Sequence, residues 1–161
     1  MISIRLLAAA ALAVVLVACG DSDPKTLIAE GNKALTSGDS AAALEKFNEA
    51  VALLKPTDGQ FLDAKMGMIE ALIAKDPQRA SDELQQLAAA EPEKIGSKQF
   101  IYVGGQMVSA RQYEPAIKLI HAGVQRYGAE APALKLVMER IKQEAANDKG
   151  ANDLMRSLGY L

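Results

Sequence analysis

The chain has 161 residues, with 18 Lys and Arg against 20 Asp and Glu and a formal net charge of −2. This near-balance argues against a dedicated nucleic-acid-binding protein, which carries a basic surface. The single cysteine and single histidine exclude an intramolecular disulfide and metal sites that need several cysteines or paired histidines.

The first 18 residues differ from the rest of the chain, because 16 of them are apolar. Arg5 is their only charge, and an unbroken apolar run over residues 6–17 follows it. This run is shorter than the about 20 residues that a transmembrane helix needs. Its layout is typical of a secretory signal peptide, so we expect residues 1–18 to be a cleaved leader.

The sequence Leu16-Val17-Ala18-Cys19 resembles the lipobox of bacterial lipoproteins. In that family the cysteine thiol carries a diacylglycerol, the leader is cleaved before the cysteine, and the new amino group is usually acylated too. The resemblance implies that Cys19 is the lipidation site and that its acyl chains anchor the protein. Gly20 stands where an aspartate would favour retention in the inner membrane, which implies the periplasmic face of the outer membrane. An ordinary signal peptide with an incidental cysteine is the alternative.

Residues 19–24 are expected to form a short polar tether. The five residues after Cys19 can span at most about 16 to 18 Å. The folded part, residues 25–161, should therefore lie close to the membrane, and it is long enough for one domain with its own core.

The chain after the leader is predicted to be all-helical. Its prolines fall between apolar-periodic stretches or in their first turns, where helices tolerate them. Alternating patterns typical of strands are scarce. We predict helices over residues 25–37, 40–55, 60–74, 77–90, 95–110, 114–127, 131–146 and 150–158.

Apolar triplets recur along the chain at intervals of 36 and 37 residues, which indicates repeated helical hairpins. The spacing within each triplet, i, i+4 and i+7, is one face of a helix. Triplets in the second helix of each pair are Ala43, Phe47 and Ala50; Ala80, Leu84 and Leu87; and Ala116, Ile120 and Gly123. Those in the first helix are Leu27, Gly31 and Ala34; Ala64, Met68 and Ala71; and Phe100, Gly104 and Met107.

This pattern resembles the tetratricopeptide repeat, a helical hairpin of about 34 residues. Residues 24–57 are the best copy, with Gly31 in the first helix, Ala43 and Phe47 in the second, and a closing Pro56. Residues 97–128 and, less closely, 61–92 follow the same plan. The resemblance implies a short α-solenoid of three such hairpins and a degenerate C-terminal capping hairpin. The apolar residues of that capping hairpin are Leu134, Val137, Met138, Ile141, Leu154 and Leu158.

Hairpins this short must stack, because none can bury both of its apolar stripes alone. Small residues are expected where helices approach most closely, namely Gly31, Ala43, Gly104 and Ala116. The apolar C-terminal stretch, residues 153–161, is expected to cover the open end of the stack, with a docking peptide as the alternative.

The solenoid interpretation predicts a partner-binding groove on the first helix of each hairpin. The residues predicted to line it are Lys25, Ile28, Asn32 and Leu35, then Leu62, Lys65, Ile69 and Leu72, then Lys98, Ile101, Gly105 and Val108. An apolar groove with several lysines suits an amphipathic helix or an extended peptide of acidic character. The alternative is that several of these isoleucines and leucines belong to the core.

The residues that could carry catalysis are sparse. The chain contains no G-x-S-x-G, no glycine loop that cradles phosphate and no H-E-x-x-H. His121 has no second histidine or cysteine to share a metal or a proton, so we expect it at the surface or hydrogen-bonded. We expect neither an enzyme, nor a metal site, nor a cofactor.

These features predict a membrane-anchored interaction scaffold of the bacterial cell envelope. Its groove would hold a peptide or helix of an envelope protein, while acyl chains would hold the scaffold to the membrane. The alternative is a periplasmic chaperone-like protein or a carrier of small apolar ligands, which would accept many ligands weakly.

Overall fold

The computed structural model describes residues 23–128 and 132–161, and within them the chain forms eight α-helices and no strands. The helices are α1 (Pro24–Thr36), α2 (Ser40–Leu53), α3 (Phe61–Ile73), α4 (Pro77–Ala90), α5 (Ser97–Ser109), α6 (Tyr113–Tyr127), α7 (Pro132–Glu144) and α8 (Lys149–Ser157). All eight predicted helices are confirmed, with small shifts at their ends. The predicted leader, the predicted lipidation site Cys19, residues 20–22 of the predicted tether and residue 131 of the predicted seventh helix lie outside the described residues.

Aspartate side chains start several of these helices. Asp23 accepts a hydrogen bond from the backbone N–H of Lys25 at 2.8 Å, and Asp76 caps α4 in the same manner through Arg79 at 3.0 Å. A proline follows each of these two aspartates and occupies the first helical turn, where its missing N–H costs nothing. Pro24, which the predicted tether included, already belongs to α1.

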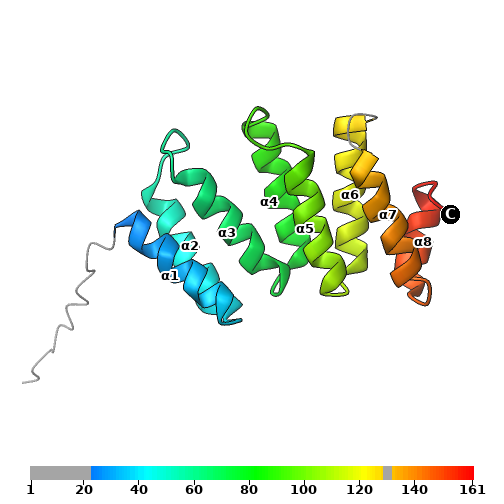
Figure 1. The fold of residues 1–161 in the computed structure, drawn as a ribbon, viewed down its shortest axis with the longest axis horizontal. Helices are drawn as coiled ribbons and strands as arrows, with labels where there is room; N and C mark the ends of the chain where they lie inside the picture. The colour runs from blue at the N-terminus through cyan, green and yellow to red at the C-terminus, as the bar shows by residue number, and fades with distance from the viewer. Residues whose placement is uncertain (1–22, 129–131) are drawn as a thin grey trace, which may run out of the picture.

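The helices stack side by side in chain order as two layers (Figure 1). The odd-numbered layer places α1 against α3, α3 against α5 and α5 against α7. In the even-numbered layer α4 packs on α6 and α6 packs on α8. Helix α2 packs across the layers, on α1 of its own hairpin and on α3 of the next. The fold is the all-α, short solenoid that the repeats predict, closed at its C-terminal end by a capping hairpin that packs on α6.

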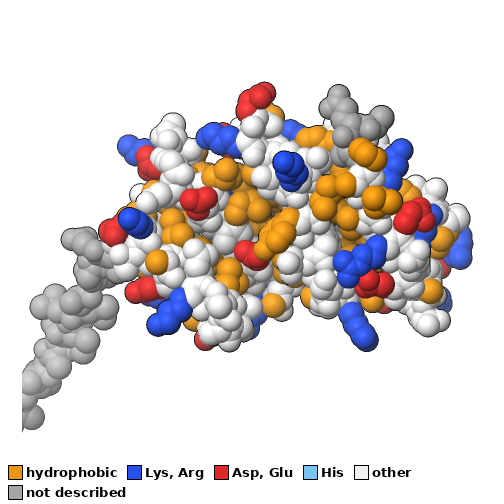
Figure 2. Space-filling model, in the orientation of Figure 1, with side chains coloured by type: hydrophobic (Ala, Val, Ile, Leu, Met, Phe, Trp, Pro, Cys, Tyr) orange, Lys and Arg blue, Asp and Glu red, His pale blue; other side chains and the backbone are white. Residues whose placement is uncertain are grey.

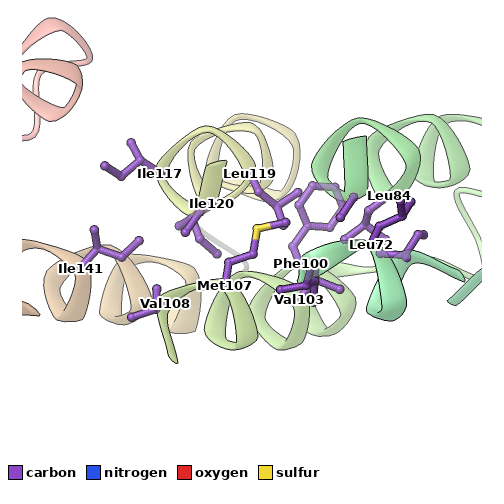
Figure 3. Packing of buried hydrophobic residues seen from close by; sticks show 14 of the residues in the cluster. Leu72, Leu84, Phe100, Val103, Met107, Val108, Ile117, Leu119, Ile120 and Ile141 are labelled. Atoms are coloured by element: carbon purple, nitrogen blue, oxygen red, sulfur yellow. The ribbon is translucent and has the colours of Figure 1, made fainter. Parts of the chain in front are cut away.

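The main apolar core runs along the stack between the layers. Phe100 and Met107 of α5 point toward Leu119 and Ile120 of α6, and residues of α3 and α4 continue the cluster (Figure 3). Burying such side chains contributes roughly 1.5 to 3 kcal/mol each. Neighbouring hairpins therefore share this core, and a second, smaller cluster of Leu27, Ala50 and Ala64 joins the first hairpin to the start of α3.

Small residues lie at the closest helix approaches, as predicted. Ala43 and Ala116 are fully buried. A Cβ atom on Gly31 would lie 2.8 Å from Cζ of Phe47, and one on Gly104 would lie 2.5 Å from Cδ1 of Ile120. Larger side chains at these positions would push the paired helices apart.

The C-terminal stretch covers the end of the stack, which confirms its expected role. Met155 of α8 is fully buried, and Leu158 and Tyr160 pack against the core. The Tyr160 hydroxyl lies 3.0 Å from Nδ1 of His121 in α6, and the two rings meet edge to face. His121 is therefore hydrogen-bonded within the fold.

Within residues 23–128 and 132–161, no helix combines the length and the apolar character that crossing a membrane requires.

Candidate functional site

Three of the predicted groove residues belong to the core. Ile69 and Val108 are fully buried and Leu72 is 1% exposed. All three are members of the continuous apolar cluster, so they face neighbouring helices and not an open groove. The predicted groove is corrected at these positions, because a partner could reach them only by separating packed helices.

The other predicted residues retain some exposure. Lys25, Asn32 and Lys98 are exposed. Ile28, Leu35, Leu62 and Ile101 are half-buried and pack on the core with one side, as apolar residues at the margin of a helix interface do. Gly105 faces open space, since no atom lies within 4 Å of a Cβ built on it.

Lys65 is engaged inside the fold. Its Nζ donates to Oε2 of Glu83 in α4 at 2.8 Å, and the two side chains are 20% and 18% exposed. The Glu83 carboxylate also lies 3.7 Å from Nε of Arg79. Lys65 therefore ties α3 to α4, and its charge is already compensated before any partner binds.

A line of apolar side chains crosses the outer side of the odd-numbered layer, one from each helix. These residues, which we call the apolar row, are Ala29, Met66, Tyr102 and Leu136. Each stands two residues after a buried repeat position, so the four share one place on successive helices. Tyr102 is 47% exposed and Leu136 is 71% exposed, and Ala29 is also exposed, whereas Met66 is half-buried and packs on the core with one side. Figure 2 shows hydrophobic side chains gathered on this face over α3, α5 and α7.

The apolar row was not among the predicted binding residues. Met66, Tyr102 and Leu136 recur at intervals close to the repeat length, and this recurrence is the signal that could have identified them. The apolar periodicity of each helix, however, mainly reports the side that faces the core, because that side holds most of the apolar residues. Only the packing of α3 and α5 reveals which apolar positions stay outside it.

Tyr102 links two helices of the layer. Its hydroxyl donates a hydrogen bond to Oε1 of Glu70 in α3. This bond, together with partial burial and the nearby negative charge, raises the pKa of Tyr102 to about 12. The Glu70 carboxylate is thereby occupied, and the Tyr102 ring is held at the surface between α3 and α5.

Lysines border the face at the ends where these helices begin. Lys98 lies in the first turn of α5, is exposed, and forms no ion pair within the described part of the chain. A cation at a helix N-terminus opposes the helix dipole, so this position does not serve the stability of α5. Lys25 occupies the same position in α1, and Lys135 lies at the end of the first turn of α7, two residues further along the helix than Lys98 does in α5.

The surface pockets along the described residues differ in size and in lining. Pockets of about 140 and 180 Å³ adjoin around Pro56, Phe61 and Glu91. One of about 540 Å³ is lined by polar and charged groups that include Arg111 and Glu144, and one of about 520 Å³ lies along α1 alone. Among residues 23–128 and 132–161, no three His, Cys, Asp or Glu side chains cluster as metal ligands.

A scan against protein-family models found no matching family, and searches of curated proteins and of solved structures found no matching protein or structure.

Proposed function

We propose that the protein is a membrane-anchored scaffold of the bacterial cell envelope that holds a peptide or helix of a partner protein. The surface that would hold it is the outer side of the odd-numbered layer. The observation that carries the proposal is the apolar row, in which Tyr102 and Leu136 stand exposed on neighbouring helices.

The composition of this face supports protein binding. Apolar side chains scattered singly on a surface are ordinary, but apolar side chains that recur at one place on successive helices can be contacted together by one extended partner. Tyrosine is enriched at protein interfaces because it offers a large, stiff ring with a polar tip. Tyr102 presents its ring in this way, while its hydroxyl is anchored by Glu70.

The membrane anchor rests on the leader and on the resemblance of Cys19 to a lipobox cysteine. Two or three acyl chains would give a stable anchor, since each buried methylene contributes about 0.8 kcal/mol. The N-cap of α1 is Asp23, so three residues separate it from Cys19. A solenoid on so short a tether would present its face within a short distance of the membrane.

The repeat pattern supports placing the solenoid in the tetratricopeptide class. The positions that the resemblance assigns to close packing, Gly31, Ala43, Gly104 and Ala116, are all buried in contact with a partner helix. Solenoids of hairpin repeats commonly use an extended face for binding. A solenoid that binds proteins through one face, and that acyl chains hold to a membrane, would act as a scaffold in the envelope.

Binding of protein is favoured over transport of a small apolar ligand. Pockets for ligands of ordinary size enclose about 300 to 1,000 Å³ and are mainly apolar. Here the pockets around Phe61 are smaller, and the pocket beside Arg111 is lined by polar groups. The hollow of about 520 Å³ along α1 is bounded by that one helix and lies open, so it would not enclose a ligand. The large apolar side chains exposed on this face, Tyr102 and Leu136, stand on its surface and do not line a cavity. Such side chains suit a macromolecular partner.

The proposal is tested by mass spectrometry and site-specific cross-linking in cells. The mature chain should begin at Cys19 with acyl mass, and Cys19→Ala should release the protein from membranes. A photo-reactive amino acid at position 102 should form an adduct with one envelope protein. The same amino acid at the exposed Leu53 of α2, in the other layer, should not. An unmodified Cys19 would remove the anchor, and equal adducts at both positions would remove the binding face.

A further inference from the structure

We propose that the partner segment is an acidic, amphipathic α-helix whose apolar residues recur about every seventh position. This inference rests on the proposed scaffold function and specifies the chemistry of the partner on the same face. Three features of the odd-numbered layer carry it: the spacing of the apolar row, the absence of free backbone groups beside the row, and the unpaired charge of Lys98.

The spacing of the apolar row sets the repeat of the partner. Met66, Tyr102 and Leu136 stand on α3, α5 and α7, which are packed neighbours. Packed helices lie about 8 to 10 Å apart. A helix rises about 1.5 Å per residue, so the upper value of this spacing corresponds to about seven residues, or two turns. Side chains at that interval share one face of the partner and can contact successive members of the row.

The hydrogen bonds that the partner's backbone needs favour a helical partner over an extended peptide. The backbone N–H and C=O groups in the middle of α3, α5 and α7 bond within their own helices. An extended peptide lying across them would leave its own backbone groups without protein partners. The Tyr102 hydroxyl, which could have helped, is already bonded to Glu70. A helical partner satisfies its backbone internally and offers only side chains to the row.

Charge complementarity assigns the acidic flank. Lys25, Lys98 and Lys135 border the starts of α1, α5 and α7, while Asp63 is the one acidic residue in the first turns of the four described odd-numbered helices. Two carboxylates nearer the row already have partners within the fold. Glu70 accepts a hydrogen bond from Tyr102, and Glu139 forms an ion pair with Lys142 at 2.9 Å. Lys98 has no ion partner among the described residues, so a carboxylate on the bound helix would supply one.

The proposal is tested by selection from a library of displayed random peptides of helical length. The full protein, isolated from membranes and held in lipid nanodiscs, is the target, and a Tyr102→Ser, Leu136→Gln double variant is the counter-target. Both side chains are exposed, so the variant should keep the circular dichroism of the parent, and its melting temperature should fall only by what the lost Tyr102–Glu70 hydrogen bond contributes. Enriched peptides should carry leucine, isoleucine or phenylalanine at every seventh position and Asp or Glu along one flank.

The affinity of a selected peptide should fall about tenfold or more in the double variant, because the large contacts to the row are lost. The matched control is Leu53→Gln, which removes an exposed leucine that is 59% accessible from the even-numbered layer and should leave affinity unchanged.

A charge exchange tests the acidic flank separately. Lys98→Glu should weaken an acidic peptide about two- to fivefold, as exposed ion pairs do. The same variant should bind more tightly to a peptide whose Glu residues are replaced by Lys. Lys118→Glu, on the other layer at α6, is the control that should change neither affinity.

Other outcomes would overturn the inference. The selection would contradict it if no peptide were enriched, or if the enriched peptides were basic or lacked the seven-residue repeat. Equal binding to the parent and to the Tyr102→Ser, Leu136→Gln variant would also contradict it. A homodimer that dissociates in Leu136→Gln would assign the face to a second copy of the chain. If any of these occurred while position 102 still cross-linked to one envelope protein, the scaffold function would stand and the acidic helix alone would fall.

Discussion

The ring of Phe47 in α2 lies so close to the backbone of Gly67 in α3 that a Cβ atom at position 67 would overlap it. Gly31 of α1 approaches the same ring from within the first hairpin. Phe47 is fully buried and thus joins the first hairpin to the second across two glycines. The repeat alignment places Met68 opposite Gly31, so the contact at the neighbouring Gly67 could be found only from the packing.

Gly67→Ala should destabilise the protein by about 1 to 3 kcal/mol through overpacking. This loss should appear although alanine favours a helix over glycine by up to about 1 kcal/mol. Urea denaturation measures the free energy of unfolding. Gly105→Ala is the matched control, because it has open space around it and should raise stability by up to about 1 kcal/mol. Equal effects at the two glycines would refute the close contact with Phe47.

Ala43→Leu and Ala116→Leu should each lower the free energy of unfolding by about 1 to 3 kcal/mol. Both alanines are fully buried between helices, so the added methylenes must displace a neighbour. Ala41→Leu, at an exposed position on α2, should change stability little. Thermal melts that do not distinguish Ala43 from Ala41 would contradict the stacking described for α2.

Glu70→Gln should lower the pKa of Tyr102 from about 12 toward 10, because the hydrogen bond to the carboxylate is the largest cause of its rise. A tyrosine whose pKa is higher in the folded state than in the unfolded state stabilises the fold below the unfolded value. That contribution should therefore disappear as pH rises from 10 to about 12. Spectrophotometric titration of tyrosinate, with Tyr102→Phe to identify the signal, measures the pKa. Urea denaturation of the parent and of Tyr102→Phe between pH 10 and about 12 measures the loss of stability. An unchanged titration in Glu70→Gln would show that the bond to Glu70 does not control this group.

Met155→Ala should cost about 2 to 5 kcal/mol, because it leaves a cavity where α8 covers α6. Met155 is fully buried, whereas Leu161, at 55% exposure, should tolerate alanine with little change. Removal of residues 151–161 should likewise lower the melting temperature. Stability retained after that truncation would mean that the C-terminal helix does not close the stack.

The helices were predictable because their starts and stops are local. Aspartates at the N-caps and prolines in the first turns act within a few residues of their own position, as Asp23 with Pro24 and Asp76 with Pro77 illustrate. The period of the apolar triplets then implied the stack, since each hairpin needs its neighbour to bury its second stripe.

The binding face was harder to predict from the same pattern. Helix α3 packs on α1, α2, α4 and α5, and Ile69 and Leu72 are consequently buried. Helix α1 stands at the end of the stack, so the equivalent Asn32 and Leu35 keep some exposure. A repeat aligns positions that are equivalent in sequence, but the number of neighbours around a helix differs along a short stack.

The amino-acid sequence by itself determined where the helices lie, to within a few residues, and the repeat period, and the proposed anchor rests on it alone. Each of these depends on residues close together in the chain or on a regular interval. The tertiary structure decided which apolar residues face outward, that Lys65 is paired with Glu83, and that Phe47 lies between two glycines. These depend on how many helices surround each side chain, and that number is set only when the hairpins pack.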